Sequence, residues 1–348
     1  MKNTNRINAL ITGSSGFMGK YLVSEFLDKD CPIKINKLIG FDQHENDAIN
    51  DERFSFIKGD VRNFQDVLEA CKGIDLVVHA AAIVDWGTRP ESEVYDVNVK
   101  GTENIVKACK ENNVKAMIFT SSLDAVFTGK PQVDIDESVP YPEKFHSMYC
   151  KSKCLGEKIV LSENSESFRT CALRPSDVYG EDDPYHIESL INMAKSGFYV
   201  RLGNGKSKSQ HVYVGNIAYA HVLAGKALLE NNEKIGGNAY FITDSKGTNF
   251  FKFFDNIVLY SGYKIWPKNI WIPIKIAYTM GAISEFVAIL ARPIKKYNPK
   301  FSRFAVTYTC NDFTFSSKKA TNDFGFKPKY SQEEAFKRTI DFYKKPGK

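Results

Sequence analysis

Several features that mark specialised classes of protein are missing from this 348-residue sequence. It has no internal repeat and no low-complexity tract, which argues against a solenoid or a disordered chain. The seven cysteines form no C-x-x-C pair and match no zinc-site spacing, so we expect reduced thiols and no metal site. The net charge of +6 is scattered rather than gathered in a basic stripe, so no nucleic-acid partner is expected.

An export signal is also missing. The first residues are polar and lead directly into a strand-like segment, without an apolar signal sequence and cleavage site. We therefore expect a cytoplasmic protein. A hydrophobic content of 43% and a charged content of 25% are ordinary for a globular chain, so a large core is available.

Short apolar runs alternate with amphipathic stretches in the first half of the chain. The runs at 8–12, 37–41, 76–79, 116–120 and 170–173 are typical of buried parallel strands. Helical patterns such as 18–27 and 103–111 lie between them. This alternation predicts an α/β fold with a Rossmann-type, doubly wound parallel sheet.

A glycine-rich segment at 12–19 follows the first expected strand and opens a helix. Gly13 suits a tight turn, Gly16 lets a pyrophosphate approach the backbone, and Gly19 lets the helix pack closely on the sheet. The spacing alone is weak evidence, but a strand before it and a helix after it are the context that a dinucleotide-binding loop requires. Cofactor contacts are predicted from Gly13, Ser15, Gly16, Phe17, Met18 and Gly19.

Asp42 ends the second expected strand, about twenty residues beyond the last glycine. A carboxylate there can accept hydrogen bonds from both ribose hydroxyls and would repel a 2′-phosphate, which favours NAD over NADP. An ordinary surface acid is the competing interpretation. Asp60 and Val61, after the third strand, are expected to contact the adenine.

The pattern loosens after about Pro175, with more Pro, Gly and aromatic residues. We expect residues 1–175 to form the NAD-binding core, joined by strands and helices that return from about 205–245. Residues 176–348 are expected to form mainly a smaller, C-terminal substrate-binding lobe.

Tyr149 and Lys153 lie four residues apart at the start of an expected helix and therefore share one face. A free phenol titrates near pH 10, so we expect the Lys153 ammonium to lower the pKa of Tyr149 by about two to three pH units and make it a general base. Tyr260 and Lys264 have the same spacing. Only Tyr149 follows the strand ending in Thr-Ser-Ser at 120–122, at the sheet edge where ligands bind, so Tyr260 and Lys264 are expected at the surface.

Five motifs occur in order along the chain: Gly13-x-x-Gly16-x-x-Gly19, His79-Ala80-Ala81, NVKGT at 98–102, TSS at 120–122 and Tyr149-x-x-x-Lys153. With these motifs in this order, the chain resembles the extended short-chain dehydrogenase/reductase superfamily. Within it, the closest resemblance is to the 3β-hydroxysteroid dehydrogenase family. That match is carried by HVYVGN at 211–216 with Ala220-His221, GNAYF at 237–241, FTFS at 313–316 with KKA at 318–320, and the apolar segment ending Arg292-Pro293.

The resemblance implies a role for each matched residue. Tyr149 would be the general base, Lys153 its electrostatic partner, and Ser122 the group that hydrogen-bonds the substrate oxygen, with Ser121 as the close alternative. Asn98 would support the helix that carries Lys153. The NAD cofactor would also contact Ala80, Ala81, Lys153 and Pro175, and the Arg174-Pro175-Ser176 stretch would lie at its nicotinamide end.

The implied reaction is NAD-dependent oxidation of a 3β-hydroxysteroid or sterol to the 3-ketone. Some members also isomerise the 5-ene to a 4-ene, but Lys151 stands where some bifunctional members carry His, so isomerisation is left open. Reduction of another bulky apolar ketone or 3-keto acid is the main alternative. A sugar-nucleotide epimerase fits less well because the C-terminal half is apolar and aromatic. A non-catalytic sensor would normally have lost Tyr149 or Lys153. A homodimer is left open.

The apolar segment at 271–291 is expected to contain a helix over 274–290, with a narrow polar stripe of Lys275, Thr279 and Glu285. These polar residues and Pro273 disfavour a membrane span. The basic residues Arg292, Lys295, Lys296 and Lys300 follow, which suits a helix lying on an anionic membrane surface. A core helix closing the substrate pocket is the alternative; the resemblance favours peripheral membrane contact through 271–300.

Overall fold

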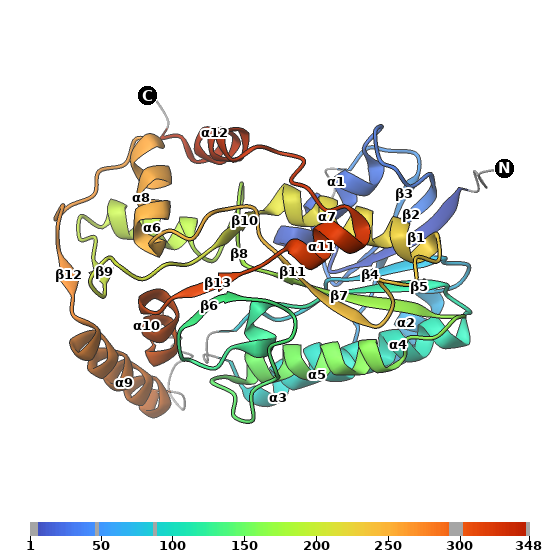
Figure 1. Cartoon of the computed structure of the whole chain (residues 1–348), viewed down its shortest axis with the longest axis horizontal. Coiled ribbons are helices and arrows are strands. Elements are labelled where there is room, and N and C mark those ends of the chain that lie inside the picture. Colours follow the sequence, from blue (N-terminus) through green and yellow to red (C-terminus); the bar gives the residue numbers. More distant parts are fainter. Residues whose placement is uncertain (1–5, 46–48, 86–88, 292–301, 346–348) are drawn as a thin grey trace.

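The protein is built around a seven-stranded sheet in which every neighbouring pair of strands is parallel (Figure 1). The structure, a computed structural model, describes residues 6–45, 49–85, 89–291 and 302–345. The strand order is β11-β7-β5-β4-β1-β2-β3. The bounds are β1 (Ile7–Thr12), β2 (Ile35–Asp42), β3 (Phe54–Lys58), β4 (Leu76–His79), β5 (Ala116–Thr120), β7 (Arg169–Pro175) and β11 (Asn238–Ile242). The predicted doubly wound sheet is confirmed.

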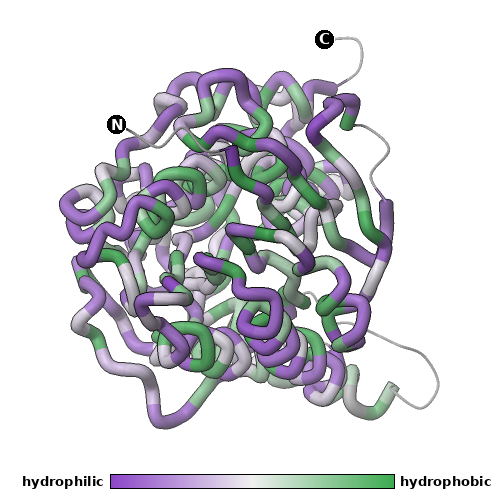
Figure 2. Tube along the Cα trace, turned by 90° about the vertical axis from the view of Figure 1, so that its right-hand side faces the viewer, coloured by the Kyte–Doolittle hydropathy of each residue, from purple (hydrophilic) through white to green (hydrophobic). Residues whose placement is uncertain are grey.

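Helices cover both faces of the sheet (Figure 1). One layer contains α1 (Phe17–Leu27), α7 (Val214–Leu229) and α11 (Lys318–Phe324), and the other contains α2 (Phe64–Ala70), α4 (Gly101–Glu111) and α5 (Met148–Ser162). The short α3 (Glu91–Tyr95) and the π-helical turn η1 (Asp96–Lys100) lead into α4. Each layer buries its own apolar cluster against the sheet. Figure 2 shows hydrophobic (green) stretches alternating with hydrophilic (purple) ones along the chain.

Most of the remaining elements lie on the left-hand side of Figure 1, away from β1, β2 and β3. Three parallel strand pairs join β8 (Asp177–Tyr179) to β10 (His211–Tyr213), β6 (Gln132–Ile135) to β13 (Phe313–Phe315), and β9 (Arg201–Leu202) to β12 (Trp271–Ile272). The helices are α6 (Ile187–Lys195), α8 (Phe250–Tyr260), α9 (Ile274–Ala291), α10 (Arg303–Cys310) and α12 (Gln332–Tyr343). Of the range 205–245, α7 and β11 pack into the central core.

The chain order reverses between β1 and β4, which are neighbours in the sheet although β2 and β3 separate them in sequence. In open α/β sheets, ligands bind outside the carboxyl ends of the strands at such a switch point. The glycine loop follows β1 and Ala80-Ala81 follows β4, so both predicted cofactor segments lie at this point.

The helix expected at 274–290 is present as α9. It packs against α10, where the Arg303 backbone N–H and Nε both donate to the Glu285 carboxylate at 2.7 Å. Among the described residues, no helix combines the length and apolarity needed to cross a bilayer. The basic residues predicted to follow α9, Arg292 to Lys300, lie outside the described part of the chain.

Candidate active site

The glycine loop leaves no space for side chains at two of its three glycines. Gly13 has φ +73°, and a Cβ there would lie 2.7 Å from the Ala81 nitrogen. A Cβ on Gly19 would lie 1.9 Å from the Gly13 carbonyl oxygen, so α1 can approach β1 only with glycine at this position. Gly16 is the N-cap of α1 and faces the cavity at the helix N-terminus. The loop therefore fits the backbone cradle that a pyrophosphate needs.

Asp42, at the end of β2, lies beside this loop. Its carboxylate accepts the Ser15 backbone N–H at 3.2 Å and the His44 backbone N–H at 3.2 Å. Two backbone donors fix the carboxylate at the rim, where it can still accept from ribose hydroxyls. Asp60 is placed differently, because its carboxylate pairs with Arg62 at 2.5 Å and does not line the cavity.

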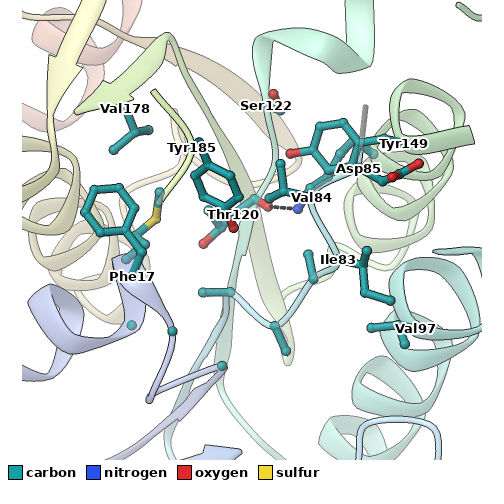
Figure 3. Close-up of a pocket in the computed structure, with 18 of the residues that line it drawn as sticks. Phe17, Ile83, Val84, Asp85, Val97, Thr120, Ser122, Tyr149, Val178 and Tyr185 are labelled. Atoms are coloured by element: carbon teal, nitrogen blue, oxygen red, sulfur yellow. Dashed lines mark hydrogen bonds between the residues drawn. The ribbon is translucent and has the colours of Figure 1, made fainter. Parts of the chain in front are cut away.

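A cavity of about 420 Å³ runs from the glycine loop to Tyr149 (Figure 3). Most of the predicted site residues line it: Gly13, Gly16, Phe17, Met18, Gly19, Asp42, Val61, Ala80, Ala81, Ser122, Tyr149, Lys153 and Pro175. Three predicted residues, Ser15, Asp60 and Asn98, lie outside the lining. Pro175 and Ser176 face the cavity, whereas the Arg174 side chain is held by Glu157.

Helix α5 brings Tyr149 and Lys153 to the carboxyl edge of β5. The Ser147 hydroxyl caps the helix by accepting the Cys150 N–H at 3.1 Å. Lys153 Nζ donates to the Thr120 carbonyl at 2.9 Å, drawn as a dashed line in Figure 3, and lies 5.9 Å from the centroid of the Tyr149 ring. Both side chains are buried. Tyr260, by contrast, is 72% exposed at the end of α8.

The two serines after β5 face different partners. Ser121 Oγ donates to the Glu157 carboxylate at 2.5 Å. Ser122 Oγ donates to Asp124 Oδ2 at 2.8 Å. Both serines line the same cavity as Tyr149, but the Ser121 hydroxyl is engaged by the buried Glu157 carboxylate.

Asn98 lies outside the cavity lining and contacts the elements that form the site. It lies in the π-helical turn η1, and its side-chain amide donates to Ser152 Oγ at 3.0 Å and to the Ile83 carbonyl at 2.9 Å. Its carbonyl oxygen accepts the Ile83 N–H at 2.8 Å. Asn98 thus joins α5 to the segment after β4, and its partner Ser152 is the residue before Lys153.

Known proteins share both the sequence pattern and this fold. A model of the 3-beta hydroxysteroid dehydrogenase/isomerase family matches residues 10–272. The chain belongs to this family. It is 32% identical over 349 residues to 3beta-hydroxysteroid-dehydrogenase/decarboxylase isoform 1 of Arabidopsis thaliana, covering 96% of this chain and 79% of the relative. It is 30% identical over 336 residues to sterol-4-alpha-carboxylate 3-dehydrogenase, decarboxylating, of Mus musculus, covering 96% and 90%.

Solved structures share the fold of this member of the 3-beta hydroxysteroid dehydrogenase/isomerase family. The crystal structure of gox2253 superposes with a TM-score of 0.75 at 22% identity, covering 99% of each chain. MoeE5, solved in complex with UDP-glucuronic acid and NAD, gives a TM-score of 0.70 at 19% identity, covering 96% of this chain and 98% of that one. The predicted family and fold class are both confirmed.

The predicted lowering of the Tyr149 pKa is wrong. Burial, and next the negative charge of Asp124, raise the pKa of Tyr149 well above its ordinary value. Burial also lowers the pKa of Lys153 to about 8, so the ammonium is itself disfavoured in this site. Desolvation outweighs the charge of a lysine one helical turn away, and sequence spacing cannot show how deeply such a pair is buried.

Asp124 also lines the cavity, and it is not among the site residues predicted from the sequence. Its N–H donates back to Ser122 Oγ at 3.1 Å, so the serine caps the 3₁₀ turn η2 (Leu123–Val126). Burial raises the pKa of Asp124 to about 7. A serine two residues before a carboxylate, directly after a strand, is the local signal that could have identified it.

C-terminal elements complete the far end of the cavity. Phe304 and Tyr308 come from α10, and Val178 comes from β8. Asp177 accepts a hydrogen bond from the Tyr308 hydroxyl, and its other oxygen lies 3.5 Å from His211 Nδ1. No residue of α9 lines this cavity among the residues that the structure describes, so α10 rather than α9 closes it.

Proposed function

We propose that this chain is an NAD-dependent dehydrogenase that oxidises the 3β-hydroxyl of a steroid or sterol to a ketone. The observation that carries the proposal is a single cavity with the glycine loop at one end and Tyr149, Ser122 and Lys153 at the other. Bound NAD supplies the acceptor for the hydride that leaves the carbinol carbon. The negative charge of the Asp42 carboxylate at the ribose end favours NAD over its 2′-phosphorylated form.

The chain's own residues hold the substrate oxygen and move its proton. Tyr149 receives the hydroxyl proton, and Ser122 hydrogen-bonds the same oxygen. Lys153 is held by the Thr120 carbonyl so that its ammonium stays beside the phenol. Asn98 fixes α5 through Ser152 and thereby positions both Tyr149 and Lys153.

The aromatic and aliphatic far end of the cavity suits a rigid apolar substrate. Phe304, Val178 and Leu123 supply apolar surface there, while few polar groups fix the orientation of a ligand. The carboxyls of Asp124 and Asp177 lie in this cavity too, beside the imidazole of His186, and one imidazole is little positive charge for a diphosphate. These features favour a steroid over the sugar-nucleotide alternative.

Decarboxylation of a sterol 4-carboxylate is the second candidate. Both curated relatives carry decarboxylation in their names. Oxidation at C3 would turn such a substrate into a β-keto acid, which loses CO₂ because the ketone accepts the electron pair of the breaking bond. His186 lines the cavity, and although burial opposes it, the hydrogen bond and charge of Asp183 raise its pKa. His186 can therefore supply positive charge for a 4-carboxylate.

A substrate panel tests these assignments. Purified protein is incubated with NAD⁺ and 3β-hydroxysteroids with and without a 4α-carboxyl group, with 3α-epimers as matched controls and a 3-hydroxy fatty acid as the alternative. NADH absorbance should rise with 3β-hydroxysteroids and not with their 3α-epimers. The 4-ene-3-one chromophore in the same run reports isomerisation. Turnover of the fatty acid alone would overturn the steroid assignment.

Peripheral contact of α9 with a membrane surface is the remaining part of the proposal. Large apolar side chains are exposed along this helix, including Ile276, Ile283, Phe286 and Leu290, which are 55–61% exposed. Exposed apolar surface concentrated on one helix is typical of an interaction site. A sterol substrate would dissolve in the same membrane, which places the enzyme next to its substrate.

A further inference from the structure

Tyr185 lies on the segment between β8 and α6, and its side chain lines the cavity. The Tyr185 ring meets the Phe17 ring edge-on, with the two centroids 6.5 Å apart and the planes at 68°. Figure 3 shows the Tyr185 side chain between Phe17 on one side and Tyr149 on the other. The residue is 36% exposed, so part of its surface is accessible to a ligand. Tyr185 therefore occupies the stretch of the cavity between the glycine loop and Tyr149.

Hydrogen bonds to Asp183 fix the turn that carries Tyr185. The Asp183 carboxylate is fully buried, and it accepts the backbone N–H of Tyr185 at 2.8 Å and that of His186 at 3.1 Å. The Tyr343 hydroxyl from α12 donates to the Asp183 carbonyl at 3.2 Å. A side chain that binds the backbone of the next residues holds the chain in a turn. The Tyr185 ring is therefore presented to the cavity in a defined position.

The same turn is tied to α1, the helix that opens at the glycine loop. Lys20 Nζ donates to the Asp182 carboxylate at 2.7 Å, and the Tyr21 hydroxyl donates to the Glu181 carbonyl at 3.2 Å. The Lys20–Asp182 pair is exposed and contributes little stability by itself. Both bonds nevertheless join the turn to the cofactor-binding helix. The position of Tyr185 is therefore set relative to the glycine loop.

The stretch of the cavity beside Tyr185 suits the nicotinamide half of NAD. The pyrophosphate is expected at Gly16 and the N-terminus of α1, and the reacting hydroxyl is expected beside Tyr149. Hydride transfer requires the nicotinamide ring and the carbinol carbon to come within about 3–3.5 Å of each other. The ring must therefore lie between the glycine loop and Tyr149. A substrate can reach Tyr149 without extending as far as Phe17.

We propose that Tyr185, together with Phe17, binds the nicotinamide ring of NAD and holds it beside Tyr149. This inference rests on the proposed dehydrogenase function, which places the reacting carbon at Tyr149. Aromatic side chains pack on other flat rings in offset or edge-on arrangements, so the ring of Tyr185 carries the contact rather than its hydroxyl. Asp183 is a positioning residue, because it acts through the backbone of Tyr185.

Calorimetry with NAD and with ADP-ribose, which lacks the nicotinamide ring, tests the contact without a substrate. For Tyr185→Ala we expect the Kd for NAD to rise about five- to tenfold and the Kd for ADP-ribose to change by less than about twofold. Tyr185→Phe keeps the ring and should bind both ligands as the native protein does. Tyr260→Ala removes a tyrosine that is 72% exposed and outside the cavity lining, and it serves as the matched control.

Turnover supplies a second measurement. Loss of the Tyr185 ring leaves the nicotinamide less well oriented, so kcat for sterol oxidation should fall about 10- to 100-fold in Tyr185→Ala. The KM for the sterol should change by less than about threefold, because the contact is with the cofactor. Tyr185→Phe should keep kcat within about twofold of the native value. Similar Tm values for all variants would show that the losses do not come from unfolding.

The outcomes separate this inference from the proposed function. If Tyr185→Ala weakens NAD and ADP-ribose equally, Tyr185 only supports the fold and the inference is overturned. A raised KM for the sterol with unchanged cofactor affinities would place Tyr185 against the substrate and would also overturn it. If the native protein oxidises no sterol but Tyr185→Ala still loses affinity for NAD alone, the proposed function is overturned and the nicotinamide contact stands.

Discussion

Arg174 and Glu157 form a buried ion pair that joins the last turns of α5 to the end of β7. Arg174 Nη2 lies 2.5 Å from Glu157 Oε1, and their side chains are 3% and 0% exposed. The same carboxylate accepts the hydroxyls of Ser121 at 2.5 Å and Tyr141 at 2.6 Å. This pairing explains why the Arg174 side chain turns away from the cavity while Pro175 and Ser176 face it.

Replacing one partner of this pair should destabilise the fold. Glu157→Gln leaves the buried guanidinium without its counter-charge, so we expect the free energy of unfolding to drop by about 3–5 kcal/mol in urea titrations. Glu69→Gln breaks the exposed Glu69–Lys72 pair and should change stability by less than about 0.5 kcal/mol. Equal losses of unfolding free energy in the two variants would show that the buried Glu157–Arg174 pair stabilises the fold no more than an exposed pair does.

Tyr149→Phe should abolish the reaction without abolishing cofactor binding. Loss of the hydroxyl removes the group that receives the substrate proton, so we expect kcat to fall by about 10²–10⁴-fold. NAD affinity, measured by calorimetry, should change little because the ring remains in place. Tyr260→Phe removes the hydroxyl of the other Tyr-x-x-x-Lys pair and serves as the control with native activity. Near-normal turnover by Tyr149→Phe would remove this tyrosine from the proposed chemistry.

Asp42→Ala should weaken NAD binding and reduce discrimination against NADP. The carboxylate is placed to accept from the ribose, and a hydrogen bond to a charged group contributes about 1.5–3 kcal/mol. We therefore expect the Kd for NAD to rise about 10- to 100-fold, with a smaller change for NADP, both measured by calorimetry. Asp60→Ala, which removes a carboxylate outside the cavity, is the comparison. An unchanged ratio of the two cofactors' affinities would show that Asp42 is only a surface acid.

Asp124→Asn should become more stable relative to the native protein as pH rises. Burial raises the pKa of Asp124 from 3.8 to about 7, so the folded state binds this proton more tightly than the unfolded state does. The native protein gains stability from the bound proton at low pH and loses it between about pH 4 and pH 7, by an amount on the order of 4 kcal/mol.

Chemical denaturation at pH 4 and at pH 8 measures this difference between the native protein and Asp124→Asn. Asp244→Asn should show the same sign with a smaller amplitude, because the pKa of Asp244 is raised only to about 6. A constant difference between the native protein and Asp124→Asn across this range would mean that Asp124 ionises normally.

Charges placed on α9 should prevent membrane attachment without affecting the fold. Phe286 is 61% exposed, and Phe286→Glu would put a carboxylate into the headgroup region of a bound bilayer. We expect the native protein to co-sediment with vesicles containing phosphatidylserine and the variant to remain in the supernatant. Phe198→Glu changes a residue that is 56% exposed on another part of the surface and should leave binding intact. Equal binding by all three proteins would exclude α9 as the contact.

Local patterns in the sequence were sufficient for the sheet and the cofactor loop. Apolar runs marked β1, β2, β4, β5 and β7 to within a few residues, because buried parallel strands are apolar on both faces. The glycines at 13 and 19 could be assigned because their requirement is steric and local, and the structure shows the close approaches that exclude a Cβ. The four-residue spacing of Tyr149 and Lys153 was likewise sufficient to predict that they share one face of a helix.

Long-range packing decided the rest. The pKa of Tyr149 depends on how many groups bury it and on a carboxyl that enters from η2, and neither can be read from a four-residue spacing. The helix α10 rather than α9 closes the far end of the cavity. The position of Asp60 is the exception, because its partner Arg62 is only two residues away and the pair was a local possibility that the sequence already contained. The sequence alone therefore determined which backbone could hold a dinucleotide, since propensity and steric limits act locally. Only the tertiary structure decided the ionisation of the site, because desolvation and charge act through space among residues far apart in the chain.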